Sequence, residues 1–185
     1  MKVKGRTCGK CSMCCYLLDI PELSKPANRW CEYCKPGRGG CGVYETRPEV
    51  CEKFKCLWLE GWLPQDYWQP QKARMVAFGS TDDGVPVLKI QVDVQQPNRW
   101  REEPYWSQIR GTSLWGLRQQ PKRLVVVFVG RNKFLVLGSN VVENPPDDGQ
   151  LVQRGPDDWA FVAAPVASPG SGQPSCRDGR LVLWE

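Results

Sequence analysis

The stretch RLVVVFVG (residues 123–130) contains six consecutive apolar residues between Arg123 and Gly130. An apolar run of this length, rich in β-branched valine, is typical of a strand that is buried on both faces. The segment NKFLVLG (132–138) follows directly and is expected to pair with it. Together the two segments predict the centre of a β-sheet.

Segments on the N-terminal side extend this sheet. ARMVAFG (73–79) and VPVLKIQVDV (85–94) flank the turn STDDG (80–84), a pattern that predicts a hairpin. Residues 103–117 have an uneven helical pattern that Gly111 interrupts. The sequence therefore predicts an α+β fold, in which a mostly antiparallel sheet carries one or two helices.

The first third of the chain has a different composition, because nine of the ten cysteines lie within residues 8–56. We expect residues 1–62 to form a cysteine-rich, metal-bound N-terminal lobe that packs on an α+β region of residues 63–185. Segments 158–165 and 180–185 are expected to add strands to that region. The nine candidate metal ligands are Cys8, Cys11, Cys14, Cys15, Cys31, Cys34, Cys41, Cys51 and Cys56.

The spacing of these cysteines predicts metal binding. Three C-x2-C pairs occur, at Cys8/Cys11, Cys11/Cys14 and Cys31/Cys34. Two thiolates at this spacing can reach one ion from a single turn. Disulfides are the alternative, but the N-terminus lacks the apolar segment of a secretory signal, so we expect a cytoplasmic protein whose thiols stay reduced. The tenth cysteine, Cys176, is expected to be a free thiol in a flexible loop.

The charge distribution agrees with a metal–thiolate cluster. Residues 1–56 contain 11 lysines and arginines against 6 acidic residues, whereas residues 57–185 contain 14 of each. All of the net charge of +5 therefore lies within residues 1–56, the segment that contains nine of the ten cysteines. Because thiolate ligands are negatively charged, the basic residues are expected to balance them, which removes the main argument for nucleic-acid binding.

The chain has no histidine, so a zinc site would use thiolates alone or include a carboxylate. Soft thiolate ligands favour zinc, copper(I) or iron–sulfur clusters. One zinc ion needs four ligands, which leaves most of the nine cysteines unexplained. Side chains of neighbouring residues usually point in different directions. Cys14 and Cys15 are therefore expected to bind different metal ions, unless one of them bridges two ions. We expect two or more zinc ions, with an iron–sulfur cluster as the alternative.

Two motifs in this region resemble those of a known family. The C-x2-C-x2-C-C of residues 8–15, followed by CGVYETRPEVCEKF at residues 41–54, resembles the CxxCxxCC (YkgJ-like) family of zinc- or iron-chelating proteins. The second motif is matched by Cys41, Tyr44, Arg47, Pro48, Cys51 and Phe54, with Val43 where isoleucine is usual. The resemblance implies metal chelation over about residues 8–56. It also implies, as one option, a role beside a modification enzyme, because flagellin lysine N-methylases carry related cysteine clusters.

The second motif is expected to begin a helix over residues 47–62. Cys51 and Cys56 would face different directions on it, either toward different ions or because the helix breaks near Lys55. Arg47 has two interpretations. It is a solvated charge or carbonyl-bound side chain at the edge of the cluster, or it donates N–H groups to thiolate sulfur.

The sequence contains no nucleophile elbow, phosphate-binding loop or dinucleotide fingerprint. It therefore does not decide whether the protein is an enzyme. No apolar run is long enough to span a membrane. The leading hypothesis is a structural zinc protein whose α+β region binds a protein partner, with Trp100 and Trp106 filling the core or lining a groove. The alternatives are an iron–sulfur protein in electron transfer or an oxidoreductase, and a metal storage or delivery protein.

Overall fold

The computed structural model describes residues 6–35, 40–163 and 181–182. The α-helices are α1 (Met13–Leu17), α2 (Glu49–Lys53), α3 (Leu57–Glu60), α4 (Pro70–Ala73) and α5 (Tyr105–Leu117). The strands are β1 (Met75–Asp82), β2 (Val85–Val92), β3 (Leu124–Val129), β4 (Asn132–Leu137), β5 (Asn140–Glu143), β6 (Asp148–Gln153), β7 (Trp159–Ala163) and β8 (Leu181–Val182). Short 3-10 helices are η1 (Pro21–Leu23), η2 (Tyr44–Thr46), η3 (Asp66–Trp68) and η4 (Arg99–Arg101).

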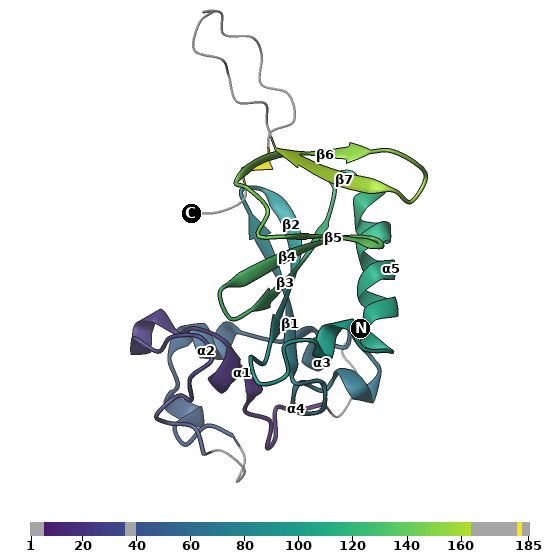
Figure 1. The fold of residues 1–185 in the computed structure, drawn as a ribbon. Coiled ribbons are helices and arrows are strands. Elements are labelled where there is room, and N and C mark those ends of the chain that lie inside the picture. Colours follow the sequence, from purple (N-terminus) through teal and green to yellow (C-terminus); the bar gives the residue numbers. More distant parts are fainter. Residues whose placement is uncertain (1–5, 36–39, 164–180, 183–185) are drawn as a thin grey trace, which may run out of the picture.

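The large sheet has the strand order β1-β2-β3-β4-β5. Its neighbouring strands are antiparallel except for β2 and β3, which are parallel. A parallel pair needs a long crossover connection, and α5 provides it. The expected α+β class with a mostly antiparallel sheet is therefore confirmed. A second sheet has the order β7-β6-β8 and lies at the opposite end of the large sheet from α1 and α2 (Figure 1).

The expected hairpin between β1 and β2 is present, with a shorter turn than the sequence suggested. The strands pair from Met75 with Val92 to Asp82 with Val85, which leaves Asp83 and Gly84 as the turn. Both turn residues have positive φ, 48° and 80°. An Asp-Gly pair in this conformation matches the twist of the flanking strands, which explains the tight connection.

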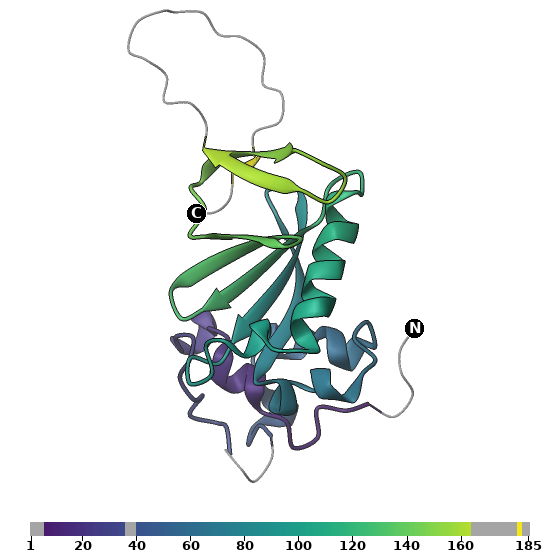
Figure 2. The same ribbon diagram turned by 45° about the vertical axis from the view of Figure 1, so that its right-hand side comes forward.

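The central strand β3 is buried on both faces, as its uninterrupted apolar run predicts. Val125 and Val127 pack with Tyr105 and Ile109 of α5, which lies along that face of the sheet (Figure 2). The alternate residues Leu124 and Val126 belong to a second core that contains Trp159 of β7. The first face is thus packed against α5, while the second face contacts Trp159 of β7 and Leu117 at the end of α5.

The helix expected over residues 47–62 is wrong as one continuous element. The chain forms the separate helices α2 and α3, and the residue after α2, Phe54, is extended. The reason is tertiary, because the Phe54 ring packs edge-on against Phe78 of β1 with 5.5 Å between centroids. The break lies beside Lys55, which agrees with the second of the two explanations given above for the different directions of Cys51 and Cys56.

Other expectations are met in part. Trp100 is fully buried and contacts Trp106, so both fill the core rather than line a groove. The strand expected at 158–165 is β7, and the described part of the one at 180–185 is β8. The sequence patterns did not indicate β5 and β6. Cys176 lies outside the described residues.

One glycine of α5 is required by close packing, which gives a stability prediction. A Cβ at Gly116 would collide with the backbone carbonyl of Arg123, whose N–H donates to the Gly116 carbonyl at 2.9 Å. Gly116→Ala is expected to lower the free energy of unfolding by about 1–3 kcal/mol. Gly111→Ala, in the same helix with nothing within 4 Å of its Cβ position, is expected to raise it by about 0.5–1 kcal/mol. Urea unfolding of both variants checks this, and equal effects would contradict the packing argument.

Candidate metal centre

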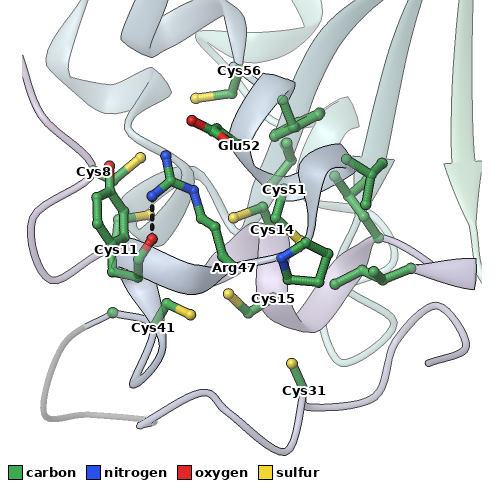
Figure 3. A pocket seen from close by; sticks show the side chains of 18 of the residues that line it. Cys8, Cys11, Cys14, Cys15, Cys31, Cys41, Arg47, Cys51, Glu52 and Cys56 are labelled. Atoms are coloured by element: carbon green, nitrogen blue, oxygen red, sulfur yellow. Dashed lines mark hydrogen bonds between the residues drawn. The ribbon is translucent and has the colours of Figure 1, made fainter. Parts of the chain in front are cut away.

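Eight cysteines from separate segments line one cavity of about 200 Å³, here called the cysteine cavity. They come from the segment before α1, from α1 itself, from the chain between α1 and α2, from α2, and from the residue that directly precedes α3 (Figure 3). The eight are Cys8, Cys11, Cys14, Cys15, Cys31, Cys41, Cys51 and Cys56. The ninth predicted ligand, Cys34, is buried beside them, and its thiol donates a hydrogen bond to Cys15.

Backbone hydrogen bonds set the positions of these thiols. The Cys11 N–H donates to the Cys8 carbonyl at 2.8 Å and closes a turn. The Cys31 N–H donates to the Cys15 carbonyl at 3.0 Å, which fixes the loop after α1 against that helix. Cys34 bonds back to Cys31 at 3.0 Å and forms a β-bridge with Cys41. The C-x2-C pairs at 8/11 and 31/34 are therefore both tight turns.

The floor of the cysteine cavity rests on the large sheet. Met13, Tyr16 and Leu17 of α1 pack on Val76 of β1 and form a small core of their own. Val76 also lines the cavity, together with apolar side chains such as Phe54. Apolar side chains thus form much of the cavity wall, although seven of the eight lining cysteines are partly exposed.

Arg6 anchors the segment that leads to Cys8. Its guanidinium donates to the carbonyls of Trp58, at 2.7 Å, and Leu63, at 3.0 Å. It also lies over the Trp58 ring, 4.5 Å from the centroid. These contacts hold the start of the described chain against the turn that follows α3.

Two positively charged side chains interact electrostatically with the cysteine thiols, and the cavity lining also includes Lys55 and the carboxylates of Asp19 and Glu52. Lys25 is buried, and its ammonium group donates to the carbonyls of Tyr16, at 3.1 Å, and Leu18. Burial lowers the pKa of Lys25, and the nearby Cys31 and Cys15 thiols oppose this shift. No sequence motif indicated Lys25; the local surplus of basic residues was the only signal.

Arg47 is the second cation, and it points into the cysteine cavity (Figure 3). Its guanidinium lies 3.9 Å from the centre of the Tyr44 ring and donates to the Tyr44 carbonyl. This is the carbonyl-bound interpretation made from the sequence. Its charge also reaches the sulfur of Cys8, where it opposes the effect of burial on the pKa of that thiol. Donation of an N–H group to thiolate sulfur stays a prediction.

The cavity raises the pKa of most of its thiols. Burial is the main cause at Cys8, Cys11, Cys51 and Cys56. It also raises the pKa of Cys34 to about 11. At Cys15 the pKa is raised first by its hydrogen bond with Cys14 and then by burial.

This electrostatic environment bears on what the cavity can bind. The thiols favour their protonated forms until additional positive charge enters the cavity. A soft cation would supply that charge and displace the protons. The donor set and its surroundings therefore fit a thiolate-binding metal.

The coordination sphere itself is not formed. All nine described cysteines are free thiols. In the part of the chain that the structure describes, no three side chains of cysteine, aspartate or glutamate are placed so that they could hold one metal ion. The predicted ligands gather around a common cavity, but they would have to move closer together to bind an ion. The metal-bound lobe expected from the sequence is thus not shown.

None of the described helices is long and apolar enough to cross a membrane. The resemblance to the CxxCxxCC family stays a prediction. Comparison of the chain with protein-family models, with curated proteins and with solved structures gave no match.

Proposed function

We propose that this protein binds two or more metal ions, with zinc as the leading candidate, through cysteine thiolates of residues 8–56. The observation that carries the proposal is the convergence of eight cysteines, from five segments of the chain, on one cavity. Four thiolates saturate one zinc ion, so the number of cysteines fits more than one ion.

The role that we propose for the metal is structural. The helices that carry the cysteines have only four or five residues each. Isolated helices shorter than about 12 residues are marginal in water, so these need support from elsewhere. Bound metal would provide it by joining segments that share few apolar contacts.

An iron–sulfur cluster is the second candidate. The specific observation in its favour is that apolar side chains, which include Val76 and Phe54, form much of the cavity wall. Clusters held by cysteine ligands have reduction potentials that depend on such shielding from solvent. In that case the protein would transfer electrons or serve as part of an oxidoreductase.

We further propose a reducing compartment such as the cytoplasm, in which free thiols persist. The α+β region would bind a protein partner. Trp115 of α5 supports this part of the proposal, because 52% of this residue is exposed. Large aromatic side chains of this kind are enriched at protein interfaces.

Elemental analysis with an absorption spectrum tests the proposal on full-length protein purified without oxygen. We expect about two zinc ions per chain, no visible absorption, and release of the zinc after all thiols are modified with a mercurial. Iron with an equal amount of sulfide and visible absorption would favour the second candidate. Protein without metal, whose thiols all react freely and which binds no added zinc, would refute both.

A further inference from the structure

Cys34 and Cys41 lie directly opposite each other in a short antiparallel bridge. Cys41 lines the cysteine cavity (Figure 3), whereas Cys34 lies outside the lining. The Lys35 N–H donates to the Gly40 carbonyl at 3.1 Å, and a second backbone bond of 2.7 Å joins the residues on the other side of the pair. Since these bonds lie on either side of the two cysteines, Cys34 and Cys41 form a non-hydrogen-bonded pair.

The backbone geometry of such a pair suits a disulfide. Its Cα atoms are about 4.5 Å apart, and disulfides join Cα atoms that are about 4.4–6.8 Å apart. Facing residues of an antiparallel pair also project to the same side, with their Cβ atoms close together. The Lys35 side chain covers the other side, because its Cε lies 3.2 Å from the place that a Cβ on Gly42 would take. Cys34 and Cys41 therefore share one face of the bridge.

The Cys34 thiol contacts two other groups in this structure. It accepts a hydrogen bond from the hydroxyl of the buried Ser12 and donates one to Cys15. Thiols are weak donors and weak acceptors, so the Cys34 side chain can rotate toward Cys41 at little cost. The backbone of Cys15 is instead bonded to that of Cys31. A single bond of this kind brings two segments together but does not set the directions of their side chains.

We propose that Cys34 and Cys41 form a disulfide when the protein meets hydrogen peroxide, which makes this pair a site of oxidative modification. Cys41 is half-buried and Cys34 is buried, so the oxidant reaches Cys41 first. The argument uses backbone pairing and exposure only, and it holds whether or not the pair also binds a metal ion.

The reaction proceeds in two steps. The Cys41 thiolate attacks one oxygen of the peroxide, the O–O bond breaks, and hydroxide leaves as the sulfur becomes a sulfenic acid. The Cys34 sulfur then attacks the sulfenic sulfur, so that the S–S bond forms and the S–O bond breaks. The departing hydroxide takes the Cys34 proton and becomes water. Two thiols thus lose two electrons and two protons, and one peroxide is reduced to two waters.

The disulfide has a consequence for metal binding that rests on the proposed function. It removes two of the nine candidate thiolate ligands, because a sulfur in a disulfide is no longer a thiolate. Oxidation of the pair is therefore expected to release zinc, and a thiol reductant should restore the capacity to bind it. The metal content of the protein would then respond to peroxide.

Peptide mapping tests the disulfide on full-length protein purified without oxygen, with its metal in place. One equivalent of hydrogen peroxide is added, the remaining thiols are alkylated, and the protein is digested with trypsin. Trypsin cleaves after Arg38, so the disulfide is expected to join the peptide of residues 30–38 to that of residues 39–53. The same sample gives the zinc released into solution.

Fragment ions decide which cysteine of each peptide is bonded, since the first also contains Cys31 and the second Cys51. We expect a bond between Cys34 and Cys41. A disulfide of Cys34 with Cys15, or full alkylation of Cys34 after peroxide treatment, would overturn the proposal.

Substitutions give a second measurement. Cys41→Ser should leave the Cys34 thiol open to alkylation after peroxide treatment, and Cys34→Ser should abolish the cross-linked peptide. Cys176→Ser, the same change outside residues 8–56, is the matched control and should keep the disulfide. Transfer of Cys34 to a different partner in Cys41→Ser, at the rate of the parent, would show that the bridge does not select its partner.

The failure of this proposal differs from the failure of metal binding. Protein that contains zinc but forms no bond between Cys34 and Cys41 contradicts the disulfide alone. Protein that forms the disulfide but binds neither zinc nor iron contradicts the proposed function alone. Protein that forms the disulfide and keeps all its zinc contradicts the release of metal, because the pair then supplies no ligand.

Discussion

Removal of the proposed zinc under reducing conditions is expected to unfold residues 6–62, while the five-stranded sheet keeps its structure. The small core of this segment consists of Met13, Tyr16 and Leu17 on Val76. The sheet has two larger cores, built around β3. Structural zinc contributes about 10–16 kcal/mol of apparent binding free energy, as much as the whole stability of a typical domain. Its loss should therefore leave the cysteine-bearing segment without sufficient support.

Hydrogen exchange with and without a strong chelator measures this effect. The amides of Leu18 and Cys31, bonded to the carbonyls of Cys14 and Cys15, should lose their protection. The amides of Ile90 and Val127, in the centre of the sheet, should keep theirs. Adding zinc back to the chelated protein is the control and should restore the first pair. Unchanged protection at Leu18 and Cys31 would show that the metal has no structural role.

Asp93→Asn is expected to destabilise the protein by about 3–5 kcal/mol. The Asp93 carboxylate is completely buried and forms an ion pair with Arg74. It also accepts the N–H of Gln95 at 2.9 Å. The amide would leave the Arg74 charge without its partner in a mostly buried site, and the loss of a buried partner costs far more than the loss of an exposed one.

Asp157→Asn is the matched control, because it makes the same chemical change in an exposed ion pair with Arg118. Exposed pairs contribute about 0–1 kcal/mol, so this variant should unfold almost as the parent does. Urea unfolding of both variants measures the two losses. The dependence of the free energy of unfolding on urea concentration is fitted as one common value for both variants. A loss below about 1 kcal/mol for Asp93→Asn would mean that the buried pair is already weakened by water.

Local patterns in the sequence predicted the elements whose structure depends on neighbouring residues. The apolar run of β3 and the hairpin of β1 and β2 are of this kind, because strand burial and hairpin turns follow from residues next to each other. The parallel pairing of β2 with β3 is not, since it depends on where α5 returns the chain. The helix over residues 47–62 was wrong for the same reason, because Phe54 packs on a strand more than twenty residues away.

The candidate site divides in a similar way. The spacing of the cysteines predicted which residues would gather, and eight of the nine line one cavity. Spacing could not predict that Cys34 lies outside the lining, nor that the coordination sphere is open. No sequence pattern indicated the pair of Asp93 with Arg74, because the turn between α4 and β1 brings Arg74 to Asp93. Lys25 gave no signal because its role depends on carbonyl groups of α1 that only the fold positions.

The contacts of Arg6 have a thermodynamic consequence for any ion that joins Cys8 to Cys56. Arg6 and Trp58 stand two residues outside these two cysteines, so their hydrogen bond already closes almost the same loop. The chain entropy lost in closing a loop of that length is about 3.5 kcal/mol at room temperature. The two chain segments that carry the Cys8 and Cys56 thiols are therefore held together before an ion binds. Its binding can then be tighter than the ligands alone would allow, through a side chain that touches no metal.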